Sequence, residues 1–306
     1  MLGFVLSLAL ACLSSAICGD ATTKQTKLNL QRHNSSGSVI SVAVSVGNEV
    51  INVTSKRYVS FTIDASQVTD GRYNFSNTQM RYLMKQLSPA VLRVGGTQAD
   101  YTYYEVGDEN PCKLPSSDYH CLSMSRLSEM VDMAKDVGAY LIYGLSIGYP
   151  EYPDMSTSAW NGSNTRQMLQ YLHDSKKYTT EDIYGFELGN EVNKDVLPSF
   201  QSRALYSLQS ILEDVYAWNA SSSSFQLWGP DPHSYTLREN AHDFDWIIEF
   251  IESTCDILHA ITYHSYVNQN QSQIFTLNGL SLSLFLSQCN ARILYILYIL
   301  YIYRHQ

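Results

Sequence analysis

The chain has 306 residues, of which 45% are hydrophobic and 16% are charged, and its formal net charge at pH 7 is -9. This length and hydrophobic content allow one large domain or two small ones with a buried core, and they exclude a disordered polymer. The negative charge argues against a nucleic-acid-binding protein, which would carry a basic face. The sequence has no histidine or cysteine cluster with zinc spacing and no glycine-rich phosphate loop, so we expect neither a metal nor another cofactor.

Residues 1–18, MLGFVLSLALACLSSAIC, form an apolar run that ends in small residues and is typical of a secretory signal peptide. Cleavage is expected after Ala16 or Cys18, although the run lacks a basic start. An uncleaved anchor is the alternative, but the run is short for a membrane span. We therefore expect a secreted protein, extracellular or lysosomal. Glycosylation is expected at the asparagines of the N-x-S/T sequons, which are Asn34, Asn52, Asn74, Asn161, Asn219 and Asn270.

Residues 19–45 are rich in Ser, Thr and Asn and are expected to be a loose lead-in. From residue 59 onward, short apolar strands alternate with helical stretches. Strands are expected at 59–64, 90–96, 140–147, 184–190, 225–231 and 257–266. Helical spacing puts apolar residues on one face in the segments between them. These residues are Met80, Leu83, Met84 and Leu87; Leu127, Met130, Val131, Ala134 and Val137, with Gly138 as the stop; the stretch 168–172; and Leu205, Leu208, Leu212 and Val215.

Cys112 and Cys121 bracket a polar loop, KLPSSDYH, that a disulfide bond could close, with two free thiols as the alternative. A disulfide would agree with secretion.

Near-continuously apolar strands that alternate with helices indicate an α/β fold with a parallel sheet. Both a doubly wound sheet and a (β/α)8 barrel of TIM-barrel type fit this alternation. Polar residues at or just after the C-terminal ends of at least five strands favour the barrel, whose strand ends meet at one mouth, whereas a doubly wound sheet gathers its site at one switch point. These residues are Asp64, Thr97, Asn190, Glu191, Asp231 and His264. About six of the eight strands are expected, so residues 46–267 form an incomplete barrel.

Residues 268–306 differ in character and include ILYILYILYIY, whose period of three matches neither a helix nor a strand. This apolar stretch is too short to cross a bilayer. Our hypothesis is that this tail is translated non-coding sequence; a true hydrophobic tail that anchors or oligomerises the chain is the alternative.

The segment YGFELGNEVN ends a strand with an amide and a carboxylate, Asn190 and Glu191. Glycoside hydrolysis needs two carboxyl groups at the scissile bond, one of which protonates the leaving oxygen. On a barrel rim, Glu191 is suitably placed to be that acid, and Asn190 could bind a sugar hydroxyl next to the reacting carbon. An isolated Asn-Glu pair is more often a solvated turn, but its position after the fourth strand favours the catalytic interpretation.

FELGNEVN resembles the strand-four signature of the heparanase-type glycoside hydrolases, which include heparanases and leech-type hyaluronidases. VSFTIDA, LSPAVLRVGGT, LWGPD and ITYHSY resemble other motifs of that family in the same order, so the resemblance covers roughly residues 45–268. It implies a retaining β-glucuronidase on a (β/α)8 barrel with a β-sandwich, which is absent here.

The resemblance also implies roles for individual residues. Glu191 falls on the acid/base and Asn190 on its substrate-binding neighbour. The other substrate-binding positions implied are Asp64, Thr97, His264 and Tyr266. The alternative for Asp64 is a cap at the strand end, and the alternative for His264 is a satisfied core histidine. Asp231 fits either a functional or a structural role and is left outside the catalytic set.

The family's nucleophile is a glutamate at the end of strand seven, and no glutamate follows Glu252 in this chain. The 306-residue chain is therefore expected to be inactive and to fold poorly alone. The expected partner is a glycosaminoglycan, heparan sulfate or hyaluronan, or another glucuronide-containing polysaccharide, while an association with a membrane or the extracellular matrix stays open. The alternative is a truncated, non-catalytic glycan-binding or regulatory product. The acidic net charge weakens the case for a highly sulfated ligand.

Overall fold

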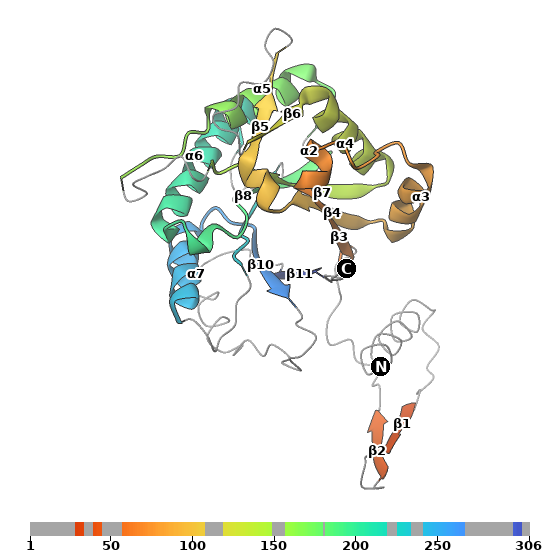
Figure 1. Ribbon diagram of the computed structural model, residues 1–306. Coiled ribbons are helices and arrows are strands. Elements are labelled where there is room, and N and C mark those ends of the chain that lie inside the picture. The colour runs from red at the N-terminus through yellow and green to blue at the C-terminus, as the bar shows by residue number, and fades with distance from the viewer. Residues whose placement is uncertain are drawn as a thin grey trace. The chain divides into compact units, whose positions relative to one another are not determined.

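Parallel strands and helices alternate along most of the chain in the computed structural model (Figure 1). The structure describes residues 57–107, 119–148, 157–179, 181–218, 225–233 and 241–266. At 28–33, 39–44, 241–244, 263, 265–266 and 296–301, it describes the backbone alone. The chain divides into two units, residues 1–55 and 56–306. The predicted signal peptide lies outside the described residues.

The first unit contains an antiparallel pair, β1 (Leu28–His33) and β2 (Val39–Val44). The sequence predicted only a loose lead-in here, with the boundary at residue 45 rather than 55. The valines and isoleucine of VISVAV are residues that favour strands, and their number outweighs the polar character of the flanking segments.

The second unit is built on one parallel sheet, in the order β11-β10-β9-β8-β7-β4-β3. All six predicted strands are present in it. Their bounds are β3 (Ser60–Asp64), β4 (Ala90–Gly95), β7 (Ala139–Leu145), β8 (Ile183–Leu188), β9 (Gln226–Pro230) and β10 (Ala260–Tyr266). β11 (Ile296–Tyr301) comes from the tail and pairs in parallel with β10. A period of three did not predict this strand. Whether the tail is translated non-coding sequence stays a hypothesis.

Helices lie along the outside of this sheet, from α3 beside β3 to α7 near β10 (Figure 1). The main helices are α3 (Thr78–Leu87), α4 (Met124–Asp136), α5 (Ser163–Ser175), α6 (Pro198–Tyr216) and α7 (Ala241–Thr254). Shorter elements are α2 (Ala65–Thr69), η1 (Thr97–Tyr101), η2 (Val192–Lys194) and the parallel pair β5 (Thr102–Glu105) and β6 (His120–Ser123). A parallel sheet with helices on its outer face is an incomplete (β/α)8 barrel, so the predicted fold class is confirmed.

Local sequence explains the helix ends. α4 begins where the Ser123 hydroxyl accepts a hydrogen bond from the Arg126 N–H at 3.2 Å. It ends before Gly138, whose φ of +71° a residue with a side chain adopts only with strain. The predicted apolar face of α4 is buried.

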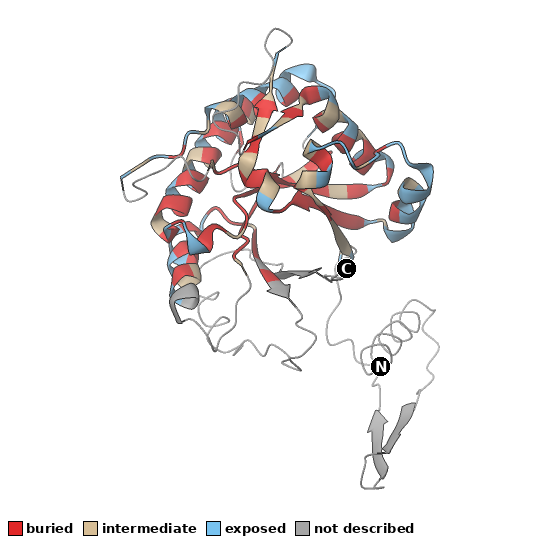
Figure 2. Ribbon diagram, viewed as in Figure 1, coloured by how far each residue is buried: buried red, intermediate tan, exposed pale blue. Residues whose placement is uncertain are grey.

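The apolar stripe predicted for α3 is mostly not buried. Met84 lies in the core, but Met80, Leu83 and Leu87 are 42%, 59% and 45% exposed. α3 follows β3, which is an edge strand of the sheet, so α3 has a neighbouring helix, α4, on one side only. The outward apolar face of α3 is therefore exposed to solvent (Figure 2). Helical periodicity predicts which residues share a face, but not whether another element covers that face.

Successive residues of each strand face opposite sides of the sheet, and this alternation separates two kinds of core. Leu92 and Val94 of β4 belong to the large cluster between sheet and helices. Val91 packs on the inner side with Ile142, Trp228 and Ala260 of neighbouring strands. Arg93 follows Val91 on the same inner face, one layer nearer the C-terminal ends of the strands. The apolar inner layer therefore supports a polar layer at the predicted mouth.

Candidate active site

The polar layer centres on a buried arginine. Arg93 Nε donates to Glu187 Oε2 at 2.6 Å, and Nη2 contacts Asp231 and Asn190 Oδ1, the latter at 3.1 Å. The side chains of Arg93, Glu187 and Asp231 are at most 1% exposed. Charges so deeply buried are stable only as paired groups, so these contacts tie β4 to β8 and to the end of β9.

Two glycines make room for the guanidinium. β7 lies between β4 and β8, and its Gly144 is paired with Glu187 in the sheet. A side chain at Gly144 would reach the Gly95 backbone, at 3.2 Å, and a Cβ at Gly95 would lie 2.7 Å from Arg93 Cζ. The Arg93 side chain therefore passes over glycine residues, which have no side chain to block it, and reaches Glu187 and Asp231. This is the physical reason for glycine at the end of LRVG.

The turn after β8 presents Asn190 and Glu191. The backbone N–H of Asn190 donates to both carboxylate oxygens of Asp100, at 3.2 and 3.1 Å, and that of Glu191 donates to the Asp231 carbonyl at 2.9 Å. Glu191 has a φ of +55°, a strained conformation for a residue with a side chain. Such strain persists only where surrounding contacts enforce it, and it is concentrated at functional sites.

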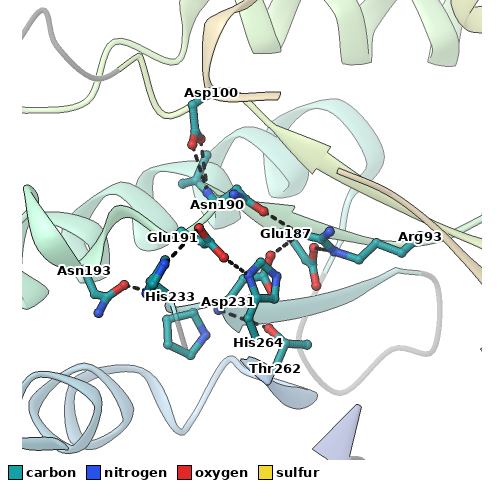
Figure 3. Close-up of polar contacts among 12 residues, drawn as sticks. Arg93, Asp100, Glu187, Asn190, Glu191, Asn193, Asp231, His233, Thr262 and His264 are labelled. Atoms are coloured by element: carbon teal, nitrogen blue, oxygen red, sulfur yellow. Dashed lines mark hydrogen bonds and ion pairs between the residues drawn. The ribbon is translucent and has the colours of Figure 1, made fainter. Parts of the chain in front are cut away.

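His264 links the two carboxylates of the site. Its Nδ1 is in hydrogen-bond contact with Glu191 Oε1, and its Nε2 lies 2.9 Å from Asp231 Oδ1. The second contact is an ion pair without the alignment of a hydrogen bond. His264 and Asp231 are buried, whereas the Glu191 side chain is 17% exposed. Figure 3 shows Glu191 and His264 pointing toward each other, with Asp231 beside the imidazole.

The network shifts the acidity of its members. Burial lowers the pKa of His264, but Asp231 and Glu191 outweigh burial and raise this pKa from 6.5 to about 9. Burial raises the pKa of Asp231, but the charges of Arg93 and His264 prevail and hold it below its usual value. For Glu187, burial prevails over Arg93 and raises the pKa to about 7. Burial also raises the pKa of Asp100 well above its usual value.

His233 lies on the more open side of Glu191. Its Nε2 is 3.9 Å from Glu191 Oε2, its side chain is 34% exposed, and its backbone N–H donates to Asn193 Oδ1 at 2.7 Å. The two oxygens of Glu191 therefore face different surroundings, a buried imidazole on one side and a partly exposed imidazole on the other.

The structure brings together Asn190, Glu191 and His264 of the predicted site. Asp64 ends β3 as predicted, but its carboxylate accepts from the Ser66 N–H at 2.9 Å and lies against Gly96, where a Cβ would be 3.0 Å from Oδ2. This capping contact is the structural alternative considered for Asp64. Thr97 is exposed at the start of η1. Within the described residues, neither Asp64 nor Thr97 has a hydrogen bond or ion pair to the Arg93 network, and their substrate-binding roles stay predictions.

Tyr266 is the last residue of β10, and only its backbone is described. Asp231, left outside the predicted catalytic set, is a central member of the network. Arg93, Glu187 and His233 were not predicted. A signal existed for the first two, since each is a single charge inside an otherwise apolar strand, and the two charges are opposite.

Cys121 is disulfide-bonded, while its predicted partner Cys112 lies outside the described residues, so the pairing stays a prediction. Of the sequon asparagines, Asn74 and Asn161 are exposed. The carboxamide oxygen of Asn74 accepts from the Ser76 N–H, and that of Asn161 from the Ser163 N–H. The other sequon asparagines, Asn34, Asn52, Asn219 and Asn270, fall outside the described ranges.

Within those ranges, no group of three or more His, Cys, Asp or Glu side chains is arranged to hold a metal ion. No helix in the part of the chain that the structure describes is long and apolar enough to cross a membrane.

A parallel barrel sheet with an Asn-Glu pair at the end of a strand, backed by a buried imidazole, is an arrangement of the glycoside hydrolase class. Residues 58–290 match the family described as glycosyl hydrolase family 79, N-terminal domain. The chain belongs to this family, which confirms the predicted heparanase-type family. The match continues past residue 267, where we expected the barrel domain to end.

Curated relatives include the baicalin-beta-D-glucuronidase of Scutellaria baicalensis, 24% identical over 73% of this chain and 48% of that protein. The heparanase of Mus musculus is 25% identical over 69% of this chain and 46% of its own length. The chain thus spans about half the length of these relatives. Among solved structures, the alpha-L-arabinofuranosidase of Thermotoga maritima superposes with a TM-score of 0.48 and 12% identity, over 74% of this chain and 49% of that one.

Proposed function

We propose that this chain is the acid/base half of a retaining hydrolase that cleaves β-glucuronide linkages, with Glu191 as the acid/base. The observation that carries the proposal is the contact of Glu191 Oε1 with His264, at the C-terminal end of β8 and beside Asn190. Glu191 is 17% exposed, so one face of the carboxylate remains accessible to a sugar. Membership of glycosyl hydrolase family 79 supports the reaction class.

We propose further that the 306-residue chain does not hydrolyse glycosides by itself. A retaining hydrolase needs a second carboxyl about 5–5.5 Å from the first. In this sheet the strand beside β10 is β11, whose sequence ILYILY contains no carboxylate. The family's nucleophile, expected on strand seven, has no counterpart there. The same observation favours the second candidate, a non-catalytic glycan-binding product.

The proposed substrate class is a β-D-glucuronide, within which a glycosaminoglycan such as heparan sulfate or hyaluronan is the polymeric case. One curated relative is named a beta-D-glucuronidase and others are named heparanases, and the first of these names supports a glucuronide as the substrate class. Asp64, Thr97, Asn190, His264 and Tyr266 are the proposed contacts to the sugar.

Chemical rescue tests the reaction and the missing nucleophile together. The purified chain is incubated with phenyl β-D-glucuronide, whose leaving group needs a proton, in the presence and absence of sodium azide. Azide can attack the sugar carbon from the side that the nucleophile would occupy, while Glu191 protonates the departing oxygen. The matched control is Glu191→Gln, which keeps the shape of the side chain but cannot act as an acid.

Azide-dependent phenol release, with glucuronyl azide of inverted configuration as product and loss of release in Glu191→Gln, supports a hydrolase that lacks its nucleophile. Phenol release without azide that also disappears in Glu191→Gln contradicts the proposed inactivity. Binding of the glucuronide, measured by ligand-observed NMR, without release under either condition favours the glycan-binding product. No binding at all overturns the proposed site.

We also propose that the protein is secreted and glycosylated. Exposed Asn74 and Asn161 support glycan attachment, because both side chains lie at the surface of the described fold. Expressed in animal cells, the chain should appear in the medium and lose mass on treatment with an N-glycosidase, less so in Asn74→Gln and Asn161→Gln. Retention in the cytosol at unmodified mass would refute secretion.

A further inference from the structure

Glu191, Asp231 and His264 form a closed ring of contacts. The Glu191 N–H donates to the Asp231 carbonyl at 2.9 Å, the Asp231 carboxylate pairs with His264 Nε2, and His264 Nδ1 contacts the Glu191 carboxylate. Asp231 is thus joined to Glu191 twice, once through the backbone and once through the imidazole. No catalytic role for Asp231 follows from the reaction proposed above.

The position of Asp231 is itself enforced. Its φ is +55°, and its backbone N–H donates to the hydroxyl of buried Thr262 at 3.1 Å. The backbone N–H of His264 donates to the Pro232 carbonyl at 3.2 Å, which fixes β10 against the segment that follows β9. Two acidic residues with left-handed backbone, Asp231 and Glu191, therefore face one imidazole from opposite sides.

An imidazole between two carboxylates has a definite chemical requirement. A neutral imidazole has one donor nitrogen and one acceptor nitrogen, so while Glu191 and Asp231 are both ionised, one of the two carboxylates would face a lone pair. The imidazolium has an N–H on both nitrogens and a positive charge, so it can donate to Glu191 through Nδ1 and form an ion pair with Asp231 through Nε2. In this buried site, where an unmatched charge is costly, the contact geometry selects the doubly protonated ring.

We propose that Asp231 is a positioning residue that holds His264 as a doubly protonated imidazolium, which in turn fixes the orientation of the Glu191 carboxylate. With Oε1 held by His264, Oε2 faces the more open side and lies 3.9 Å from His233 Nε2. The proposal assigns Oε2 to the glycosidic oxygen. This inference rests on the proposed function in one respect, because it takes Glu191 as the acid/base.

The other charges near His264 are consistent with this state. Arg93 on β4 opposes a second positive charge, and Glu187 on β8, Asp231 after β9 and Glu191 favour one. His233 adds positive charge near Glu191 only when it is protonated. Burial is the largest single influence and lowers the pKa of His264, but Asp231, as the main raising influence, and Glu191 outweigh burial and Arg93 and raise this pKa to about 9.

Histidine NMR on the purified chain tests the proposal. The ring nitrogens are labelled with 15N, His264 is assigned by loss of its signals in His264→Gln, and the ring is titrated from pH 5 to pH 10. The expected result for the wild type is an imidazolium through neutral pH, with a pKa of about 9. In Asp231→Asn the pKa should fall well below 9, because the main raising influence is removed while burial and Arg93 still oppose the charged ring.

Asp214→Asn is the matched control, since Asp214 is an exposed partner of Arg166 on the outer surface and should leave His264 unchanged. If Asp231→Asn does not fold, Glu191→Gln replaces it. There Asp231 remains, so the pKa of His264 should stay above 6.5. A neutral His264 in the wild type at pH 7, an unchanged pKa in Asp231→Asn, or a pKa at or below 6.5 in Glu191→Gln overturns the proposal. The titration does not depend on turnover, so failure of the proposed function would leave it unaffected.

Discussion

Removal of the Arg93 charge is the sharpest test of the buried network. Arg93→Leu keeps an apolar side chain of similar reach but leaves Glu187 and Asp231 without the cation that both contact. Removing one partner of a buried ion pair generally costs about 3–5 kcal/mol, because the remaining charge stays desolvated. Asp231 retains His264, so Glu187 bears most of this cost.

The cost should depend on pH, which separates it from a packing defect. Glu187 can escape a buried negative charge by taking up a proton. Its pKa in the wild type is already about 7, so relative to the wild type this escape costs about 1.36 kcal/mol for each pH unit above 7. The cost is therefore about 1–2 kcal/mol at pH 8 and close to zero at pH 5. We expect Arg93→Leu to lose about 1–2 kcal/mol more at pH 8 than at pH 5, in addition to a loss from Asp231 and from packing that is the same at both pH values.

Urea unfolding followed by tryptophan fluorescence, with each variant compared with the wild type at the same pH, gives these differences. Arg81→Leu is the control, since its ion pair with Asp136 is partly exposed at 3.4 Å and should contribute about 0–1 kcal/mol at either pH. Equal losses for Arg93→Leu at pH 5 and pH 8 would refute the electrostatic reasoning, as would a loss no larger than that of the control.

Three further predictions use the same unfolding assay. Wild-type stability should fall between pH 5 and pH 9. The stabilising contribution of protonated Glu187 is complete below its unfolded pKa of 4.5 and is lost by about pH 7, and that of protonated His264 is complete below pH 6.5, is lost by about pH 9 and is worth up to about 3 kcal/mol. Stability that is flat or rises with pH contradicts this. Gly95→Ala should cost about 1–3 kcal/mol by displacing the Arg93 guanidinium, and the cost should largely disappear when combined with Arg93→Leu. Leu83→Lys should change stability by less than about 0.5 kcal/mol, whereas a loss typical of a core position would mean that α3 is covered.

The sequence predicted the strands well because several local signals agreed. The α4–β7 unit is an example, in which an apolar stripe, the Ser123 cap and Gly138 together define one helix, and a continuous apolar run defines the next strand. Where a single signal stood alone, the prediction was incomplete. The apolar stripe of α3 predicted which residues share a face but not that this face is exposed. The three-residue repeat of the tail gave no indication of the strand β11.

The site was predicted in part for a related reason. Glu191, Asn190 and His264 follow strand ends, and a rule for barrels applies to such positions. Arg93 and Glu187 lie within strands that we expected to be apolar throughout, so these two residues were not predicted as part of the site. The Arg93–Glu187 contact joins residues 94 positions apart across an intervening strand, and such a contact becomes visible only once strand order and register are known.

The buried charges also explain what holds Glu191 in place. Arg93, Glu187, Asp231 and His264 come from β4, β8, the end of β9 and β10, and each has its partners within these strands and the turn that carries Glu191. These contacts hold Glu191 within the strands described here. A retaining mechanism uses a second carboxyl from another direction, across the sugar. For this reason a small anion, supplied from solvent, is expected to substitute for it in the rescue experiment.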